Sequence, residues 1–539
     1  MGMKRPHTSR AVWCLALVVS LGACTDLGVT NNNDPDRENL VEPGDVVSLV
    51  SSSFNTWFNG VYYYCGPGLG LSNQTFQHNA PWSNCGMDQY GRIPRAGLNN
   101  QLANEHYVQL SRVWKESYRA NAAVADGLGA LDDPEISAEL GPEMVTQLKA
   151  FGKFIQGLSL ATLALFYDRG FVVDENTDRE EPQGPVDYSA LMEAALAYFD
   201  DAIDLANSAT FDLPVHWMQA HLTSQELALL AHSYQARFRA QVARTPEERA
   251  AVDWDSVIDD VDSGLISTLT LHMDWNTNWE NSFLHYATYP NWSQLAYFMY
   301  GMADQGGDVS EWLSLPLTEK SYQFADGRPV LIVTPDLRFP QGTTVEEQRG
   351  NPGTYFRITP ASQVGDTWQK PGRGTWRWSW YKPGYGRGLD YGSLGVLDQP
   401  EITLAEMRLL KAEGLYRTGD RAGAANIINE TRVPSGLNAT DASGTNTSCV
   451  PKLPDGSCGD LWEMLKWEKR METVWTGVAG AAWFFDGRGW GDLWKGTPLQ
   501  FPISCPELHV LELLPCNTFG GPGGELSSPG STYNFPFEG

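Results

Sequence analysis

The sequence predicts an all-α fold, a TPR-like scaffold of helix pairs that carries a loop-rich, aromatic-rich face and minor β structure. Amphipathic segments of helical length follow one another through the first half of the chain, with short polar joints between them. Helices arranged in this way can each bury an apolar face on the next pair. No strict sequence repeat is present, so the prediction rests on the helix pairs alone.

The N-terminus has the layout of a secretory signal. Residues 1–10 include Lys4, Arg5 and Arg10 and no acidic residue, and residues 11–23 are almost wholly apolar. A basic region followed by a short apolar region is typical of a signal peptide. About 13 apolar residues are too few to span a bilayer, which takes roughly 20.

The apolar stretch ends in a small-residue site followed directly by Cys24, which resembles a bacterial lipobox. We therefore expect residues 1–23 to be removed as a lipoprotein signal peptide and Cys24 to carry a lipid such as palmitate. An ordinary signal peptide followed by a chance Cys, or a buried core strand, is the alternative. Thr25 lacks the acidic side chain of an inner-membrane retention signal, which favours the outer membrane.

Residues 24–40 are polar and rich in Asn and Asp, which predicts a tether between the lipid and the fold. Residues 41–270 are predicted to be the TPR-like helical region. Its periodicity is interrupted at 61–100, where Gly, Asn, Cys and aromatic residues predict a long loop excursion. The expected helices cover 101–128, 134–168, 188–209 and 224–245, and a shorter one begins at Trp254.

Residues 271–400 form a second region, poor in helical pattern and rich in Gly, Pro, Asn and aromatic residues. Eight Trp and nine Tyr occur between Trp275 and Tyr391. Trp376, Trp378 and Trp380 alternate at every second position, so on a strand they would share one face. We expect this region to form the loop-rich ligand face.

Helical pattern returns in the third region, 401–539. A helix pair is expected at its start, in which Gly419 can end the first helix and Asp420 can cap the second. A further helix is expected over about 460–475, before a Gly- and Pro-rich tail. We expect 41–539 to form one structural unit.

Six cysteines remain outside the export signal, in three sequence-local pairs. In an oxidising compartment these can close as loop disulfides, and local pairing is our prediction among the fifteen possible connectivities. The expected pairs are Cys65 with Cys85, Cys449 with Cys458, and Cys505 with Cys516. A zinc site would need CxxC or clustered Cys and His, which the scattered His do not provide, so no metal or other cofactor is expected.

Charge and motifs exclude several functions. The formal net charge of −27, without a basic patch, repels phosphate backbones, so no nucleic-acid partner is expected. The chain has no GxSxG, no phosphate-binding GxxxxGK and no HExxH. A pair of carboxylates for glycoside hydrolysis is easily found by chance among 65 acidic residues. We therefore expect no catalysis.

Four segments resemble the SusD/RagB family of nutrient-binding outer-membrane lipoproteins. They are the helix at 153–175, the Pro-Asp-Leu-Arg run at 335–338, the acidic helix with its Gly-Asp turn at 400–437, and the Trp-Phe-Phe-Asp stretch within 466–508. With the lipobox, they span nearly the whole chain in the family's order. The excursion at 61–100 and the Cys pairs are not general family features, and no acidic export run follows Cys24.

The resemblance implies an all-α, TPR-like scaffold that acts as a lid on a SusC-like TonB-dependent barrel and passes glycans or peptides into it. It also implies that Trp483, Asp486, Arg488 and Trp490 pack and pair inside the C-terminal part. Glu468, Arg470 and Glu472 are expected to form a network on a helix surface.

Aromatic side chains are the candidate ligand contacts, because sugars offer apolar C–H faces to flat rings and hydroxyls to polar groups at the rim. Asn276, Asn278 and Asn291 could supply hydrogen bonds, although Asn is also an ordinary turn residue. The alternative is that the rings fill a second core beneath long loops. The candidates are Trp82, Trp275, Trp279, Tyr286, Tyr289, Trp292, Trp376, Trp378, Trp380 and Tyr381.

The sequence thus predicts a binding subunit of an outer-membrane transport complex, lipid-anchored and exposed at the cell surface. Its partners would be an oligosaccharide or another nutrient, a SusC-like barrel and the membrane lipid. An extracellular glycoside hydrolase or lyase on a helical scaffold, and a structural lid without ligand affinity, are the alternatives.

Overall fold

The computed structural model describes residues 42–178, 184–288, 294–360, 362–365, 370–384, 396–512, 516, 526–536 and 538. Cys24 and the candidate residues Tyr289 and Trp292 lie outside these ranges. Among the helices described, none combines the length and the apolar character that a membrane crossing requires.

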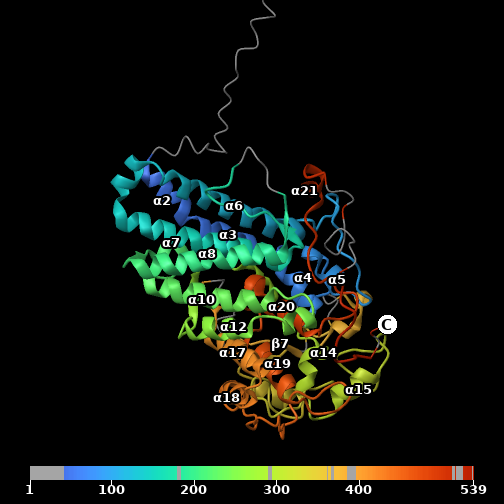
Figure 1. Ribbon diagram of the computed structural model, residues 1–539. Helices are drawn as coiled ribbons and strands as arrows, with labels where there is room; N and C mark the ends of the chain where they lie inside the picture. The colour runs from blue at the N-terminus through green and yellow to red at the C-terminus, as the bar shows by residue number, and fades with distance from the viewer. Residues whose placement is uncertain are drawn as a thin grey trace, which may run out of the picture.

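Long helices form a stack in which neighbours in sequence are neighbours in space (Figure 1). α6 packs on α7, α7 on α8, α8 on α10, and α10 on α12, while α2 and α3 lie against α6. The predicted scaffold of helix pairs is confirmed. The helices of this stack are α2 (Pro43–Ser51), α3 (Ser53–Val61), α6 (Val108–Ala130), α7 (Pro134–Phe166), α8 (Tyr188–Ser208), α10 (Ser224–Gln241) and α12 (Trp254–Asp262).

The stack continues after the aromatic region with α17 (Leu404–Thr418), α18 (Arg421–Arg432) and α19 (Leu461–Glu472). α17 packs on α12, and α18 and α19 pack on α17. The predicted boundary of the helix pair is confirmed: Gly419 has a left-handed φ of 100°, and Asp420 accepts a hydrogen bond from the Gly423 amide at 2.8 Å.

The β structure is minor, as predicted, and consists of two-stranded antiparallel ladders in the described part of the chain. One ladder joins the start of the aromatic region to its end. The pairs are β1 (Arg169–Gly170) with β2 (Val186–Asp187), β3 (Asp212–Leu213) with β4 (Leu222–Thr223), β5 (Leu269–Met273) with β8 (Leu397–Ile402), and β6 (Phe356–Ile358) with β7 (Tyr381–Pro383).

The prediction that residues 61–100 form one long loop is wrong, because this segment contains α4 (Gly68–Gln74) and α5 (Met87–Tyr90). Every residue of α4 is buried, including the polar Ser72, Asn73 and Gln74, so its sequence lacks the alternation of an apolar and a solvated face that marks an amphipathic helix. The Cys65–Cys85 disulfide joins the segments before and after α4.

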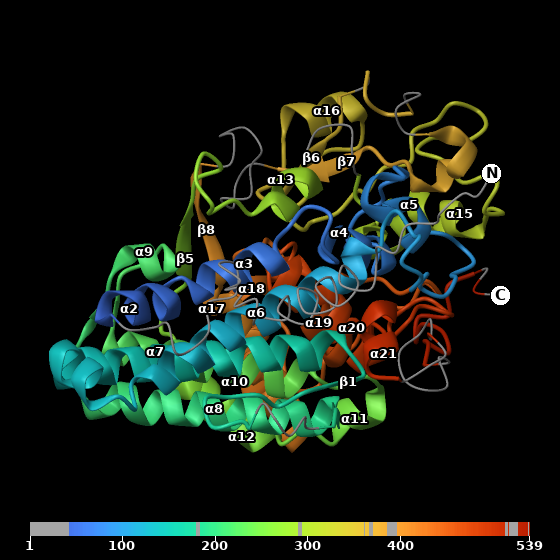
Figure 2. The ribbon, with the colours of Figure 1, turned by 90° about the horizontal axis from the view of Figure 1, so that it is seen from above.

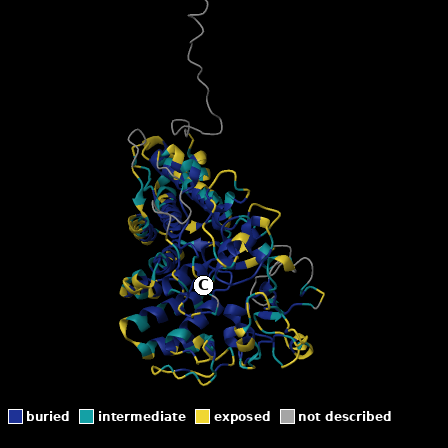
Figure 3. Cartoon of the chain, turned by 90° about the vertical axis from the view of Figure 1, so that its right-hand side faces the viewer, coloured by how far each residue is buried: buried dark blue, intermediate teal, exposed yellow. Residues whose placement is uncertain are grey.

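A second hydrophobic core, made largely of aromatic rings, lies beside the helix stack. Phe298 is central to it, with ring centroids 4.9 Å from Phe76, 5.0 Å from Trp312 and 5.2 Å from Trp494. Figure 3 shows the interior of the molecule as largely buried and many of its surface segments as exposed. The short helices around it are α13 (Ser282–Thr288), α14 (Tyr297–Tyr300), α15 (Asp308–Ser314), α16 (Val345–Gly350) and α20 (Ala482–Trp490).

The alternating tryptophans at 376–380 do not lie on a strand, so the condition under which they would share one face is not met. Thr375–Arg377 is a 3₁₀ turn that follows Gly374, whose φ is 108°. Trp376 enters the second core beside Phe76, with ring centroids 6.2 Å apart. The period-two pattern does not reveal this packing, because it depends on a residue 300 positions earlier in the chain.

Buried ion pairs hold the C-terminal part in place. Arg338, from the Pro-Asp-Leu-Arg run, lies 2.8 Å from both Asp336 and Glu468. Glu468, Arg470 and Glu472 are buried, so the predicted surface network is wrong in its location. The residues expected to pack inside the C-terminal part are buried and paired: Trp483, Asp486, Arg488 and Trp490. Trp483, for example, donates to the Arg470 carbonyl at 2.7 Å.

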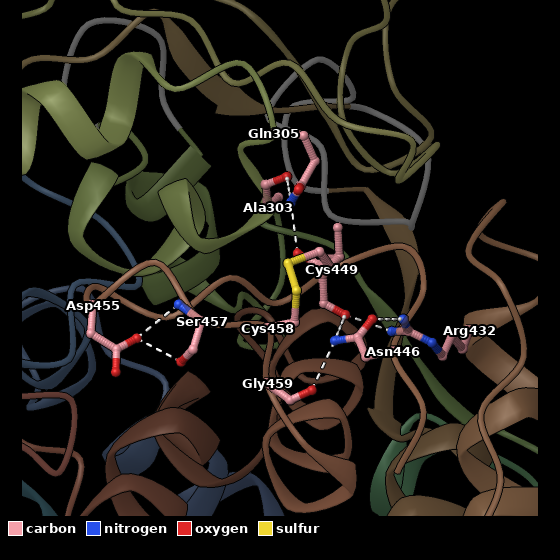
Figure 4. The surroundings of a disulfide bond; sticks show 10 residues. Ala303, Gln305, Arg432, Asn446, Cys449, Asp455, Ser457, Cys458 and Gly459 are labelled. Carbon is pink, nitrogen blue, oxygen red and sulfur yellow. Dashed lines mark hydrogen bonds between the residues drawn. A yellow bond between two sulfur atoms is a disulfide. The ribbon is translucent and has the colours of Figure 1, made fainter.

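All three predicted local disulfides are present. Figure 4 shows the Cys449–Cys458 bond in a loop fixed by hydrogen bonds. The Cys449 carbonyl accepts from Gln305 at 2.7 Å, and Asn446 donates to the Gly459 carbonyl at 2.9 Å. The loop therefore joins the second core to the helix pair.

Candidate functional site

A pocket of about 350 Å³ lies where the end of α3, the first turns of α6 and the segment between β5 and α13 meet. We call it the tyrosine pocket. Its lining combines aromatic, amide, hydroxyl and charged side chains. These are Asn59, Tyr63, Tyr64, Arg112, Trp275, Thr277, Asn278, Glu280, Ser282 and Tyr286.

Three tyrosine rings form one wall of this pocket. Tyr64 stacks on Tyr286 with ring centroids 4.6 Å apart and planes inclined by 28°. Tyr63 lies 4.9 Å from Tyr64, and the Arg112 guanidinium lies over the Tyr63 ring at 4.0 Å. Arg112 also donates through Nε to the Asn59 carbonyl at 3.3 Å. The wall is therefore fixed by contacts between three separate segments.

Trp275 projects from a tight turn that follows β5. The Asp274 amide donates to the Trp279 carbonyl at 2.9 Å, and the Asp274 carboxylate accepts from the Asn276 amide at 2.9 Å. These bonds close the turn and leave Trp275 46% exposed, an unusual state for so large an apolar ring. Pairing of β5 with β8 attaches the turn to the helix stack.

The backbone around Tyr62–Tyr64 is tied to the opposite wall. The Tyr62 carbonyl accepts from the Phe283 amide at 2.8 Å, and the Tyr64 amide donates to Ser282 Oγ at 3.0 Å. The Asn278 carbonyl accepts from Asn55 and Asn59 of α3, at 2.9 and 3.0 Å. The pocket is preorganised because both walls share these bonds.

Two titratable groups of the pocket, Glu280 and Tyr63, are shifted towards their neutral forms. Burial raises the pKa of Glu280. Burial, and then the neighbouring Tyr64, raise the pKa of Tyr63, which stays a neutral hydrogen-bonding phenol at neutral pH. The pocket thus offers flat rings together with amide, hydroxyl, carboxyl and guanidinium groups.

Of the predicted ligand residues, the structure brings Trp275 and Tyr286 together in the tyrosine pocket, along with Asn278. Trp279 lies beneath them and is 9% exposed. Its ring packs on Phe54 and Phe58, at centroid distances of 6.0 and 5.6 Å, so it supports the turn from below.

The other described candidates lie elsewhere. Trp376 and Trp378 are buried. Trp380 is half-buried, and its ring centroid lies 5.4 Å from that of Tyr322. The Lys370 amine lies over the Trp82 ring, 4.8 Å from its centroid. Tyr381 is fully buried, and its hydroxyl donates to Gln348 at 2.7 Å. Four of these five therefore pack in or against the second core, as the alternative interpretation of the aromatic region anticipated.

Sequence reasoning missed Tyr63, Tyr64, Arg112 and Glu280. The run of three tyrosines at 62–64 was the available signal, because three phenols at a helix end cannot all be buried in one core. Arg112 gave no signal, since its position over Tyr63 depends on how α6 packs on α3.

The arrangement can bind a ligand with flat apolar faces and many hydroxyls. The rings can stack on C–H faces, and the amide and carboxyl groups can take the hydroxyls around them. Among the described lining residues Glu280 is the one carboxylate, whereas glycoside hydrolysis usually uses two.

Comparison with solved structures gives the same fold at low sequence identity. A SusD superfamily protein from Bacteroides vulgatus aligns with a TM-score of 0.54 and 16% identity, over 88% of this chain and 98% of that one. A SusD homolog from Bacteroides thetaiotaomicron aligns with a TM-score of 0.54 and 14% identity, over 90% and 98%. No family model and no curated protein sequence matches the chain. The fold is therefore that of the SusD proteins.

Proposed function

We propose that this chain, which has the SusD fold, binds a soluble glycan in the tyrosine pocket. The observation that carries the proposal is the wall of Tyr63, Tyr64 and Tyr286 facing the exposed Trp275, with Arg112 and amide groups at its edge. Rings of this kind, held by bonds between distant segments, suit the stacking of sugar rings.

We further propose that the chain delivers the glycan to a SusC-like TonB-dependent barrel. The lipobox at Cys24 would anchor it to the outer membrane at the cell surface, where capture precedes transport. The SusD fold and the order of the four family-like segments support this role.

The lining of the tyrosine pocket favours binding of the glycan over its hydrolysis. The described lining holds one carboxylate, Glu280, and a second would be needed for the usual hydrolytic pair. A structural lid without affinity would have no need of an exposed Trp275 opposite a tyrosine wall.

The direct test is screening of the protein on a glycan array, followed by calorimetric titration of the best ligand. Trp275→Ala should weaken binding by about 10-fold, since a lost ring contact costs on the order of 1 kcal/mol beyond its area. Ile266→Ala, which alters an apolar side chain that is 82% exposed outside the pocket, is the matched control. Equal loss in both variants, or release of shortened glycan, would contradict the proposal.

The transport role needs a separate experiment. Affinity purification of the tagged chain from detergent-solubilised outer membranes should bring down a stoichiometric barrel. Recovery of the chain in the outer-membrane fraction without a barrel would reject delivery and leave glycan binding as its own question.

A further inference from the structure

A second pocket, of about 690 Å³, lies against another face of α6 and shares no lining residue with the tyrosine pocket. It opens between α6, the segment after β1 and α21 (Cys505–Val510), which lies beside the start of α6 in Figure 2. We call it the α21 pocket. Its lining is Tyr107, Ser111, Trp114, Lys115, Tyr118, Phe171, Val173, Ser504, Pro506 and Glu507.

Three aromatic rings that pack on one another line the α21 pocket, and we call them the aromatic cage. Trp114 packs edge-on against Tyr118, with ring centroids 4.8 Å apart, and lies 6.3 Å from Phe171. The Tyr118 hydroxyl donates to the Phe171 carbonyl at 3.2 Å, which fixes that segment against α6. Three rings from two chain segments therefore hold a defined position.

Glu507 places a carboxylate in the lining of this pocket, which also contains Lys115, and the two side chains form no ion pair. Its side chain makes no hydrogen bond or ion pair with any residue that the structure describes. Burial raises the pKa of Glu507. Burial also raises the pKa of Tyr107 and Tyr118, and the Glu507 carboxylate adds a smaller contribution in the same direction. A half-buried carboxylate of this kind is costly unless a cation compensates it.

We propose that the α21 pocket binds a small, weakly hydrated organic cation, of the trimethylammonium class. Aromatic cages attract such cations through the negative faces of their rings, and an anionic side chain adds to the attraction. A metal ion would instead need several oxygen ligands, and Glu507 is the one carboxylate in the described lining. The net charge of −27 raises the local concentration of any cation around the protein.

The test is calorimetric titration of the full chain with choline and with its uncharged isostere, 3,3-dimethylbutan-1-ol. Choline should bind, and the isostere should bind about 10-fold more weakly or worse, because only the charged ligand gains the cation–π and carboxylate attraction. Equal binding of the two would show an apolar pocket without charge selection and overturn the proposal.

Single substitutions in the lining show which side chains cause the preference for choline. Glu507→Gln keeps the shape and should remove most of the preference for choline, whereas Lys115→Gln, at the exposed rim, should strengthen choline binding slightly. Phe171→Leu should weaken it about threefold. Circular dichroism checks the fold of each variant, and unchanged choline binding in a folded Glu507→Gln protein would reject the site.

The outcome is independent of the glycan proposal. Trp275→Ala should weaken glycan binding and leave choline binding intact, because the two pockets have separate linings. Choline binding that falls in Trp275→Ala and stays in Glu507→Gln would place the cation in the tyrosine pocket and contradict the inference.

Discussion

The hydroxyl of Tyr62 donates a hydrogen bond to Glu401 Oε2 at 2.8 Å, which ties the end of α3 to β8 across the interior of the molecule. The same carboxylate accepts from Tyr234 of α10 at 2.9 Å through its other oxygen. Glu401 is thus a shared acceptor for two phenols, and one of these phenols directly precedes the tyrosine wall.

Tyr62→Phe and Tyr234→Phe form a matched pair. Each should lower the free energy of unfolding by about 1.5–3 kcal/mol, because each removes a buried hydrogen bond to a charged group. Tyr62→Phe alone should also weaken glycan binding, since it loosens the segment that carries Tyr63 and Tyr64. Denaturant unfolding and calorimetry measure the two effects, and equal glycan affinity in both variants would contradict a positioning role for Tyr62.

Arg112→Lys should weaken glycan binding by a few-fold with little change in stability. Lys keeps the charge but loses the planar group over Tyr63 and the Nε bond to Asn59, and such contacts contribute about 0.5–2 kcal/mol. Arg119→Lys, on the same helix with an exposed side chain, is the control and should bind normally. Calorimetry gives the comparison; a loss of similar size in Arg119→Lys would point to the helix and not to the pocket.

The stability of the protein should fall in mild acid because of His78. Burial lowers the pKa of His78 to about 3, and its Nε2 accepts from Asn73 Nδ2 at 3.0 Å, which requires the neutral ring. The unfolded chain, with an ordinary His pKa, binds the proton more readily, so stability is lost as the pH falls from about 6.5 towards 3. By pH 4 the loss should reach about 3 kcal/mol.

His78→Gln, which keeps an acceptor for Asn73, checks this prediction. Its unfolding free energy should depend less on pH between 7 and 4 than that of the original protein. Parallel pH profiles for the two proteins would show that other groups cause the acid sensitivity. Glu413, whose pKa the Arg249 guanidinium holds below its usual range despite burial, contributes mainly below pH 4.5.

Replacement of both Cys449 and Cys458 by Ser should lower the free energy of unfolding by about 2–4 kcal/mol, since the disulfide limits the freedom of the unfolded loop. Ser457→Ala, which removes only an exposed bond to Asp455, should change stability by about 0.5 kcal/mol or less. Chemical denaturation compares the variants. Equal stability of the double variant and the original would indicate that the hydrogen bonds around Cys449 suffice.

Long amphipathic helices and their caps were predictable because their signals are local. Gly419 and Asp420 lie next to each other in sequence and act on the same helix boundary. The burial of Glu468 was not predictable, because Arg338 comes from a segment 130 residues earlier in the chain. The burial of Trp376 was likewise not predictable, because its ring packs beside that of Phe76, which is distant in the sequence.

The residues of the candidate site, too, were only partly predictable from the sequence. Aromatic density pointed to Trp275 and Tyr286, which do line the pocket, but it pointed equally to Tyr381, which is fully buried. Composition cannot separate an exposed ring from a buried one. That distinction depends on the hydrogen bonds that close the Asp274 turn and on the bonds that join α3 to α13.

The late segments of the chain complete the early helices. The guanidinium of Arg488 donates to the Leu165 carbonyl at 3.0 Å, and the Phe501 amide donates to the Phe166 carbonyl, so the end of α7 finds its partners more than 300 residues later. A chain cut short before Arg488 would therefore leave the last carbonyls of α7 without these donors, so the C-terminal segment is needed to finish a helix that belongs to the first third of the sequence.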